Sequence, residues 1–295
     1  MGAARDEIPI ATRTVVEARL GAVTEVRRAP SANHGAAVWL ARVGETRRVV
    51  LKQHPGASRF ENERRAYETW TPALDGATPE LVAAFGSPLR VLVLSECPGA
   101  PLSSCDDLSP SERCELYFEA GRILRRLHSL PVDDPDPVPL HEALVQRFEA
   151  WLRRSAEYLD PLTRRTLSAR FGSMDDFAFA RRSPCHRDFT PANWIADRSA
   201  ASGRRLRVID FEHARLDWAL VDFVKLESER WSEQRNLREA FLDGYGRRLD
   251  DAEEEALDRL VVLHGLATMV WGAEHSDTDF ERRGRRILAS VGVDL

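Results

Sequence analysis

Residues 183–214 read SPCHRDFTPANWIADRSAASGRRLRVIDFEHA, a stretch that combines two short apolar runs with polar side chains at both ends. The apolar runs, at 194–196 and 206–209, are separated by a segment rich in Ser, Ala and Gly, which is typical of a turn between two strands. The pattern predicts a β-hairpin whose two polar ends lie close together.

Three oxygen-bearing side chains come together if this hairpin forms. A turn centred between Ala201 and Ser202 would place the residue at 193 opposite the residue at 210. Asp188 precedes Asn193 by five residues in the adjoining loop. Hard cations such as Mg²⁺ prefer oxygen ligands and commonly take only one or two from a protein. The pattern predicts Asn193 and Asp210 as Mg²⁺ ligands, and the alternative is a surface hairpin with solvated acids.

The composition is that of an ordinary globular protein. The chain has 295 residues, of which 43% are hydrophobic and 30% charged, and a formal net charge of -5. No block of Lys and Arg is interleaved with aromatic residues, so we expect no nucleic-acid partner. No segment resembles a secretory signal or a membrane span, and four cysteines without a CxxC pair suit reduced thiols. We therefore expect a cytoplasmic protein with no membrane contact, and its oligomeric state is left open.

The N-terminal part of the chain has the pattern of a small sheet. Four short runs rich in β-branched and apolar residues are bounded by Gly, Pro or Ser, at 22–29, 36–43, 46–53 and 89–96. Between the third and fourth runs, residues 58–70 have helical spacing, with Ser58 as the expected N-cap. We expect an antiparallel sheet with one helix.

The rest of the chain is mainly helical in pattern. Pro and Gly interrupt the strand pattern just after Glu96, so we place the boundary there, between residues 1–96 and residues 97–295. Ser109 and Glu112 form a capping-box pattern that predicts the first long helix. Further helices are expected at 141–159 and from about residue 218 to the end.

Several motifs together resemble the aminoglycoside phosphotransferase and choline kinase-like family, which has a protein-kinase-like fold. The segments that carry the resemblance are VVLK (49–52), FENERRAYETW (60–70), VLVLSECPGAPL (91–102), GRILRRLHSLP (121–131), HRDFTPANW (186–194), VIDFEHA (208–214) and LDWALVDFVKL (216–226). The resemblance implies an α+β, two-lobed fold. Its N-lobe, residues 1–96, is a nucleotide-binding antiparallel sheet with one helix. Its mainly helical C-lobe, residues 97–295, carries the catalytic loop, the metal site and the acceptor-binding helices.

The resemblance also implies roles for individual residues. ATP, with GTP as an open alternative, is the expected phosphate donor, with Mg²⁺ held by Asn193 and Asp210. Asp188 is the expected catalytic residue, which holds the attacking hydroxyl group. Lys52 is expected to bind the nucleotide phosphates, with Glu63 as its acidic partner. Glu61 is the other candidate partner for this lysine.

Two further observations bear on nucleotide binding. Only two of the chain's 42 basic residues, Lys52 and Lys225, are lysine, which favours a special role for Lys52. Ser95 and Cys97 follow the strand ending at 94 with i, i+2 spacing, so their main-chain groups would point the same way. In the family such groups contact the nucleotide base, and we expect the same here. The phosphate-covering loop is expected at 29–38.

The family resemblance implies transfer of the γ-phosphate to a hydroxyl group of a small molecule. An antibiotic is the first expectation for this acceptor, and choline, a sugar or an amino alcohol is the alternative. A protein kinase would need a long activation segment after Asp210, and the chain leaves no room for one. An inactive nucleotide-binding pseudokinase would typically lack one of the catalytic groups, which are all present.

Acidic and aromatic residues near the C-terminus are a candidate acceptor site. The cluster consists of Trp271, Glu274, Asp277 and Asp279. Carboxylates beside an aromatic ring suit a cationic amino sugar or quaternary amine, through ion pairing and cation–π contact. The alternative is a solvated helix end whose Asp residues cap the next helix.

Overall fold

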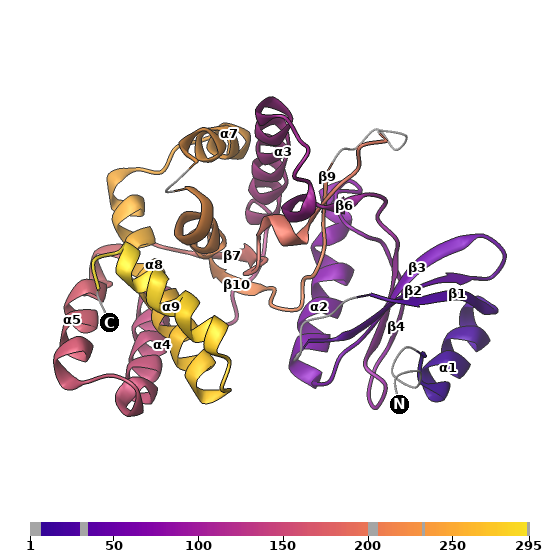
Figure 1. The fold of residues 1–295 in the computed structure, drawn as a ribbon, viewed down its shortest axis with the longest axis horizontal. Coiled ribbons are helices and arrows are strands. Elements are labelled where there is room, and N and C mark those ends of the chain that lie inside the picture. The colour runs from indigo at the N-terminus through magenta and orange to yellow at the C-terminus, as the bar shows by residue number, and fades with distance from the viewer. Residues whose placement is uncertain (1–6, 30–34, 200–205, 232–233, 294–295) are drawn as a thin grey trace. The chain divides into compact units, whose positions relative to one another are not determined.

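The computed structural model describes residues 7–29, 35–199, 206–231 and 234–293, and Figure 1 shows their fold. The chain forms two compact units, each built from two segments. The N-terminal unit comprises Met1–Leu108 and Pro191–Arg215, and the C-terminal unit comprises Ser109–Thr190 and Leu216–Leu295. Residues 97–108 and 191–215 thus group with the sheet, whereas we expected a single boundary after Glu96. The expected hairpin turn at 201–202 and residues 30–34 of the expected phosphate-covering loop lie outside the described residues.

The N-terminal unit is built on a five-stranded antiparallel sheet in the order β1-β2-β3-β5-β4. Its strands are β1 (Val23–Arg28), β2 (Ala37–Val43), β3 (Arg47–Gln53), β4 (Leu81–Phe85) and β5 (Val91–Ser95). Four of them confirm the expected strands. We did not expect β4, because its short sequence LVAAF contains two alanines, which are weak strand formers.

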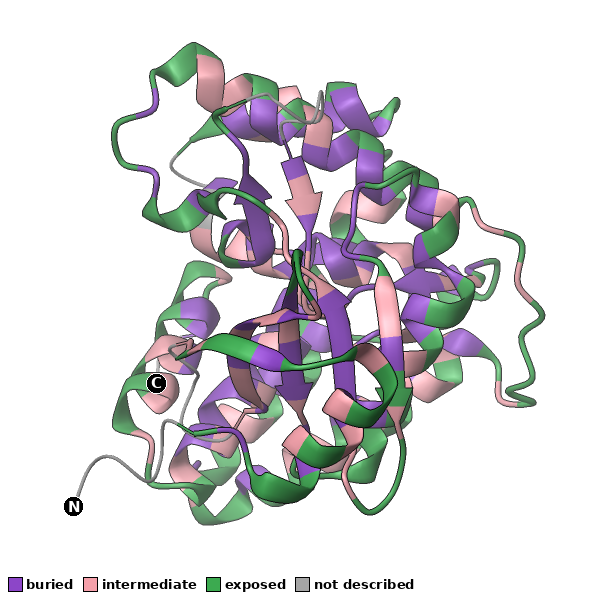
Figure 2. Cartoon of the chain, turned by 90° about the vertical axis from the view of Figure 1, so that its right-hand side faces the viewer, coloured by how far each residue is buried: buried purple, intermediate pink, exposed green. Residues whose placement is uncertain are grey.

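Two helices accompany this sheet, α1 (Ile10–Leu20) and α2 (Ala57–Thr69), where we expected one. Val16 of α1 is fully buried against the sheet core, which includes Trp39, Val49 and Leu51. Figure 2, which faces this unit, shows buried residues along the strands and exposed residues on the surrounding helices and loops. The prediction of Ser58 as the N-cap of α2 is wrong, because Gly56, in an extended conformation, occupies that position.

The expected hairpin forms within the N-terminal unit. A 3₁₀ turn (Pro191–Asn193) leads into β8 (Trp194–Ala196), which pairs with β9 (Leu206–Val208), and β6 (Ala100–Pro101) lies on the other side of β8.

The register of this hairpin differs by one residue from our prediction. Trp194 pairs with Val208, and the carbonyl oxygen of Asn193 accepts a hydrogen bond from the Ile209 amide at 3.0 Å. Asn193 therefore lies opposite Ile209 instead of Asp210. The backbone of Asp210 has a left-handed φ of 70°, so the extended strand conformation ends before it.

The C-terminal unit is mainly helical, as expected. Its long helices are α3 (Pro110–His128), α4 (Leu140–Arg154), α5 (Pro161–Phe171), α7 (Arg235–Tyr245), α8 (Asp251–Glu274) and α9 (Thr278–Ser290). Its shorter elements are β7 (Arg182–Cys185), β10 (Arg215–Trp218), α6 (Val224–Leu226) and a π-helical turn (Glu227–Trp231). The predicted capping box of α3 is present, with the amide of Ser109 donating to Glu112 at 2.9 Å. The helix expected at 141–159 ends earlier, at Arg154, where a 3₁₀ turn follows.

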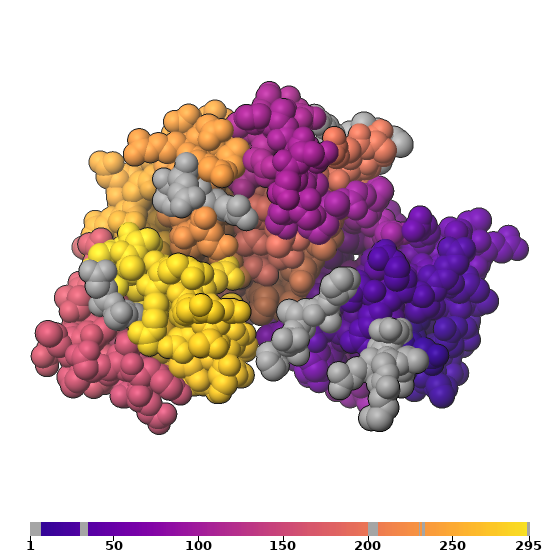
Figure 3. Space-filling model, viewed as in Figure 1, coloured from indigo at the N-terminus to yellow at the C-terminus, as the bar shows by residue number. Residues whose placement is uncertain are grey.

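Helix α8 is the centre of this unit. Twelve of its 24 residues are buried, and it packs against α4, α5, α6 and α9. In Figure 1, α8 and α9 lie side by side, and Figure 3 shows α9 in yellow on the surface of the unit. Among the described residues, no helix is both long and apolar enough to cross a lipid bilayer.

Candidate active site

Lys52 lies at the centre of a buried charge cluster in the N-terminal unit. Its ammonium nitrogen is 2.7 Å from Asp210 Oδ1, 2.8 Å from Glu63 Oε2 and 3.3 Å from Glu212 Oε2. Burial opposes the charged form of the lysine, but the three carboxylates outweigh it and raise the pKa of Lys52 far above its ordinary value. Lys52 is therefore a permanent cation surrounded by more negative charge than it neutralises.

The local structure explains why these groups meet. Alternation along β3 buries Val49 and Leu51 in the sheet core and points Lys52 to the other face, toward α2. Glu63 of α2 is fully buried, whereas Glu61 is exposed and pairs with Arg64. The contact between Lys52 and Glu63, which we preferred over one with Glu61, is confirmed.

The segment that follows β9 is attached to α2 at two points. The amide of Phe211 donates to Glu63 Oε1 at 3.2 Å, and the guanidinium of Arg59 donates to Glu212 Oε1 at 3.0 Å. The ring of Phe211 also packs edge-on against Tyr67, with ring centroids 5.5 Å apart. These contacts fix the position of Asp210 through the two residues that follow it, Phe211 and Glu212.

Sequence reasoning missed two members of this cluster. Glu212 is buried, and His54 Nε2 lies 2.8 Å from Glu63 Oε2 while its Nδ1 lies 3.8 Å from Glu212 Oε2. A signal for His54 was present, because residues two apart on a strand share a face and His54 follows Lys52 by two positions. Glu212 follows the Asp-Phe pair directly, but only the fold reveals that it is buried beside a lysine.

The two expected metal ligands lie at the open end of the hairpin in one unit, with Asn193 just before β8 and Asp210 two residues after β9. Asn193 is buried, and the Asp210 side chain is 35% exposed, so its carboxylate is open to solvent on one side. A carboxylate and an amide oxygen are hard donors, and Mg²⁺ commonly leaves its remaining positions to water and phosphate. This donor set fits Mg²⁺.

Ser95 is the last residue of β5, and Cys97 follows it by two positions. Ser95 is held by Glu80, whose amide donates to Ser95 Oγ at 2.9 Å and whose carbonyl oxygen accepts from the Ser95 amide at 2.9 Å. Burial raises the pKa of the Cys97 thiol to about 11, so this thiol is neutral at physiological pH. Base recognition by the main-chain groups of these two residues stays a prediction.

Asp188 belongs to the C-terminal unit, in the loop that follows β7. The backbone of this loop is fixed by the buried carboxylate of Asp222, which accepts from the amide of His186 at 2.8 Å and from the amide of Arg187 at 2.5 Å. Asp222 also contacts His128 Nε2 at 3.0 Å. Asp222, His186 and His128 thus form a hydrogen-bonding network under the loop.

The Asp188 carboxylate forms an ion pair with Lys225, a residue for which the sequence had predicted no function. Lys225 Nζ is 2.5 Å from Asp188 Oδ1, and both side chains are about three-quarters buried, with 27% and 25% exposed. Arg187, by contrast, turns to Asp217, whose carboxylate lies 3.1 Å from its Nε.

The structure gives separate partners to the residues of the candidate acceptor cluster. Glu274 pairs with Arg154, and Asp279 is exposed and pairs with Arg282. Asp277 Oδ1 accepts from the Phe280 amide at 3.0 Å and caps α9, as the structural alternative predicted. Trp271 stacks on His275, with ring centroids 4.1 Å apart. Binding of an acceptor by these residues stays a prediction.

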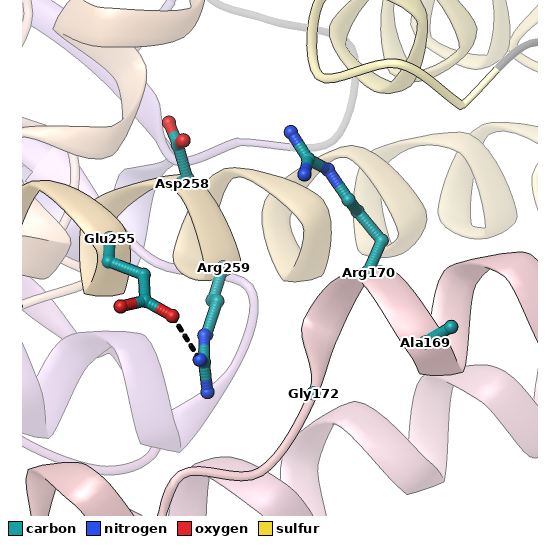
Figure 4. A pocket seen from close by; sticks show the side chains of 6 residues that line it. All are labelled: Ala169, Arg170, Gly172, Glu255, Asp258 and Arg259. Atoms are coloured by element: carbon teal, nitrogen blue, oxygen red, sulfur yellow. Dashed lines mark hydrogen bonds and ion pairs between the residues drawn. The ribbon is translucent and has the colours of Figure 1, made fainter.

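A pocket elsewhere in the C-terminal unit, between α5 and α8, contains none of the expected site residues. It is lined by Ala169, Arg170, Gly172, Glu255, Asp258 and Arg259 (Figure 4). Arg259 pairs with Glu255 across one turn of α8.

Comparison with protein families explains why these motifs occur in one chain. The model of the phosphotransferase enzyme family matches residues 26–259, which include Lys52, Asp188 and Asp210. The chain belongs to this phosphotransferase family. The expected family and the classification as an enzyme are thereby confirmed. Among curated proteins, no sequence matches this chain significantly.

Solved phosphotransferase structures share the fold over nearly the whole chain. The GDP and kanamycin complex of APH(2")-IIia has a TM-score of 0.74 at 15% identity, covering 96% of this chain and 98% of that one. The ternary complex of APH(4)-Ia with AMP-PNP and hygromycin B has a TM-score of 0.70 at 16% identity, covering 95% and 98%. Macrolide 2'-phosphotransferase MphH from Brachybacterium faecium has a TM-score of 0.65 at 16% identity, covering 94% and 96%. The expected α+β kinase-like fold is confirmed.

Proposed function

We propose that this phosphotransferase transfers the γ-phosphate of ATP to a hydroxyl group of a small-molecule antibiotic, with Mg²⁺ as the metal. The observation that carries the proposal is the buried Lys52, held at 2.8 Å by Glu63 and at 2.7 Å by Asp210. A permanent cation beside a metal-binding carboxylate is the arrangement that nucleotide phosphates require.

The charge balance of the cluster supports this use. Lys52 is shared among three carboxylates, so it can turn toward a phosphate without leaving Glu63 and Glu212 unpaired. The Phe211 amide also donates to Glu63, and Arg59 also contacts Glu212. Asp210 is then available as a metal ligand together with Asn193. Mg²⁺ held there would neutralise negative charge on the transferred phosphoryl group.

Asp188 supplies the base. In the reaction, the acceptor oxygen forms a bond to the γ-phosphorus, the bond from this phosphorus to the departing ADP oxygen breaks, and the hydroxyl proton passes to the carboxylate. The fixed backbone under the loop, held by Asp222, supports a positioning function of this kind.

The donor nucleotide and the acceptor are proposals supported by the family. Related structures contain either GDP or AMP-PNP, so GTP is the alternative donor to ATP. Their acceptors are kanamycin and hygromycin B, and another relative is a macrolide phosphotransferase. Choline, a sugar or an amino alcohol is the alternative class of acceptor. A cytoplasmic location without nucleic-acid or membrane partners stays a prediction.

A transfer assay tests the proposed function. Purified protein with Mg²⁺ and γ-labelled ATP or GTP would be incubated with kanamycin, gentamicin, streptomycin, hygromycin B, a macrolide, choline and simple sugars. We expect labelled product with at least one antibiotic and none with the Asp188→Asn variant, which should still bind nucleotide because Lys52 and Asp210 are intact. Labelling of choline or a sugar alone would move the assignment to a metabolic kinase. Wild-type protein that labels no small molecule would contradict the proposal.

A further inference from the structure

The contact between Lys225 and Asp188 is built into the C-terminal unit. The ammonium lies 2.5 Å from the carboxylate oxygen, and about three-quarters of each side chain is shielded from solvent. An ion pair on an open surface contributes little, because water screens it and two flexible side chains must be ordered. A partly buried pair at this distance imposes an orientation on the carboxylate.

The segment from Asp222 to Lys225 contacts both the backbone of the catalytic loop and the side chain of Asp188. Asp222 accepts the amides of His186 and Arg187, and Lys225 lies three residues further along, in α6. Between them, the fully buried ring of Phe223 packs edge-on against Tyr245, with ring centroids 5.1 Å apart. The segment is thus anchored in the aromatic core of the unit, so Lys225 extends from a rigid position.

Lys225 is a cation in direct contact with this carboxylate, and two other basic groups near the loop differ from it. The loop sequence from 188 to 193, DFTPAN, contains no basic residue, and Arg187 is turned to Asp217. His264 of α8 lies close by, but burial, together with the charge of Lys225, lowers the pKa of its imidazole to about 3. His264 is therefore neutral at physiological pH.

We propose that Lys225 is a positioning residue that holds the Asp188 carboxylate in one orientation toward the acceptor's hydroxyl group. This role rests on the proposed function, in which Asp188 accepts the hydroxyl proton while Lys225 keeps its own proton throughout. Phosphoryl transfer depends mainly on positioning, and a displacement of about 1 Å can cost about 100-fold in rate. Both lysines of the chain would then serve the same reaction, Lys52 at the nucleotide and Lys225 at the base.

The test first compares three single variants with wild-type protein in transfer to the antibiotic that gives the highest rate. Lys225→Met removes the charge and keeps most of the length, and we expect kcat to fall by about 30- to 100-fold while the KM for ATP stays within about twofold. Lys225→Arg retains the charge and should recover part of the rate. Arg238→Met is the matched control, since it removes a cation that pairs with Glu227 and Glu254 in the same unit, and its kcat should not change.

A double variant separates positioning from a general structural effect. Because Lys225 acts through Asp188, Lys225→Met should lower the residual rate of Asp188→Asn by no more than about twofold. A full additional loss in that background, or wild-type kcat in Lys225→Met, would overturn the role of Lys225 alone. If Lys225→Met does not fold, Lys225→Gln replaces it in the same comparisons. Wild-type protein without acceptor-dependent transfer, or an Asp188→Asn variant with wild-type turnover, would instead overturn the proposed function and this role with it.

Discussion

At the residue scale, two of the carboxylates that contact Lys52 differ in how far they are exposed to solvent. Asp210 contacts Lys52 and keeps 35% of its side chain exposed, whereas Glu63 is fully buried against Lys52 and His54. A buried carboxylate with fixed partners is suited to hold a structure, and a half-open one can exchange a partner for a ligand. This difference suits Glu63 to a structural role and supports the proposed metal-binding role of Asp210.

Removing the Asp210 carboxylate should therefore affect metal-dependent binding more than folding. We expect Asp210→Ala to raise the Mg²⁺ concentration needed for half-maximal nucleotide binding by at least about tenfold, because a charged oxygen ligand is lost. Calorimetric titration of nucleotide at several Mg²⁺ concentrations measures the effect, with Asp243→Ala, an exposed residue of α7, as the control. An unchanged Mg²⁺ dependence would show that Asp210 is not a ligand.

The half-buried imidazole of His264 predicts how stability depends on pH. Its Nε2 is shielded from solvent and has no hydrogen-bond partner among the described residues, and burial lowers its pKa from 6.5 to about 3. Between these two values the unfolded chain takes up a proton that the folded chain excludes. The contribution of His264 to stability is therefore fully present above pH 6.5 and declines as the pH falls toward 3.

Urea unfolding at pH 7.5, 6, 5 and 4 tests this expectation. The wild-type free energy of unfolding should fall more steeply with decreasing pH than that of His264→Gln, whose side chain stays neutral. Equal slopes for the two proteins would mean that His264 is protonated equally in the folded and unfolded states.

At the element scale, glycines set the distance between the helices of the C-terminal unit. Gly284 of α9 faces α8 so closely that a Cβ atom there would collide with the backbone of Met269, and Gly121 of α3 stands in the same relation to the backbone of α7 at Phe241. Tight packing of this kind buries the apolar faces of both helix pairs. Helix α8 also packs against α6, which carries Lys225.

Enlarging one of these glycines should separate two helices. Gly284→Ala inserts a methyl group against a helix backbone that cannot rotate away, and we expect a loss of about 1–3 kcal/mol in the free energy of unfolding. Gly86→Ala is the control, because nothing lies within 4 Å of a Cβ at that position. Chemical denaturation of both variants measures the difference, and equal stability would contradict the close approach of α8 and α9.

At the scale of the whole molecule, each compact unit is assembled from two separated segments of the chain. Residues 191–215 complete the N-terminal unit, since the amide of Val208 donates to the carbonyl oxygen of Ala77 at 2.8 Å and Asp210 neutralises part of the charge of Lys52. Folding of the N-terminal unit thus requires a segment that follows most of the catalytic loop in the sequence.

Separate expression of the first segment tests this assembly. We expect residues 1–108 alone to lack a cooperative unfolding transition, because Lys52 loses two of its carboxylates and apolar surface under the hairpin is exposed. The matched polypeptide carries residues 191–215 after 1–108 through a flexible Gly- and Ser-rich linker and should unfold cooperatively. Circular dichroism during urea unfolding compares the two, and equal stability would show that the hairpin is dispensable.

Much of the fold and part of the site could be predicted from local sequence. Strand runs such as 46–53, the capping box at Ser109 and the loop-then-hairpin order around Asp188 are patterns of neighbouring residues. Their physical causes are local too, because side-chain alternation, helix capping and turn chemistry act over a few positions. The exceptions, β4 and α1, have weak local patterns and are stabilised by packing against the sheet.

The sequence by itself determined the order of elements and the chemical groups available, including Lys52, Asp188 and Asp210. Only the tertiary structure decided which cation each carboxylate meets. Asp188 receives its lysine from 37 residues away, and Lys52 reaches Asp210 across 158 residues. Such pairs form because folding buries charges that must find partners to remain charged, and the partner is whichever cation the packed backbone brings within reach.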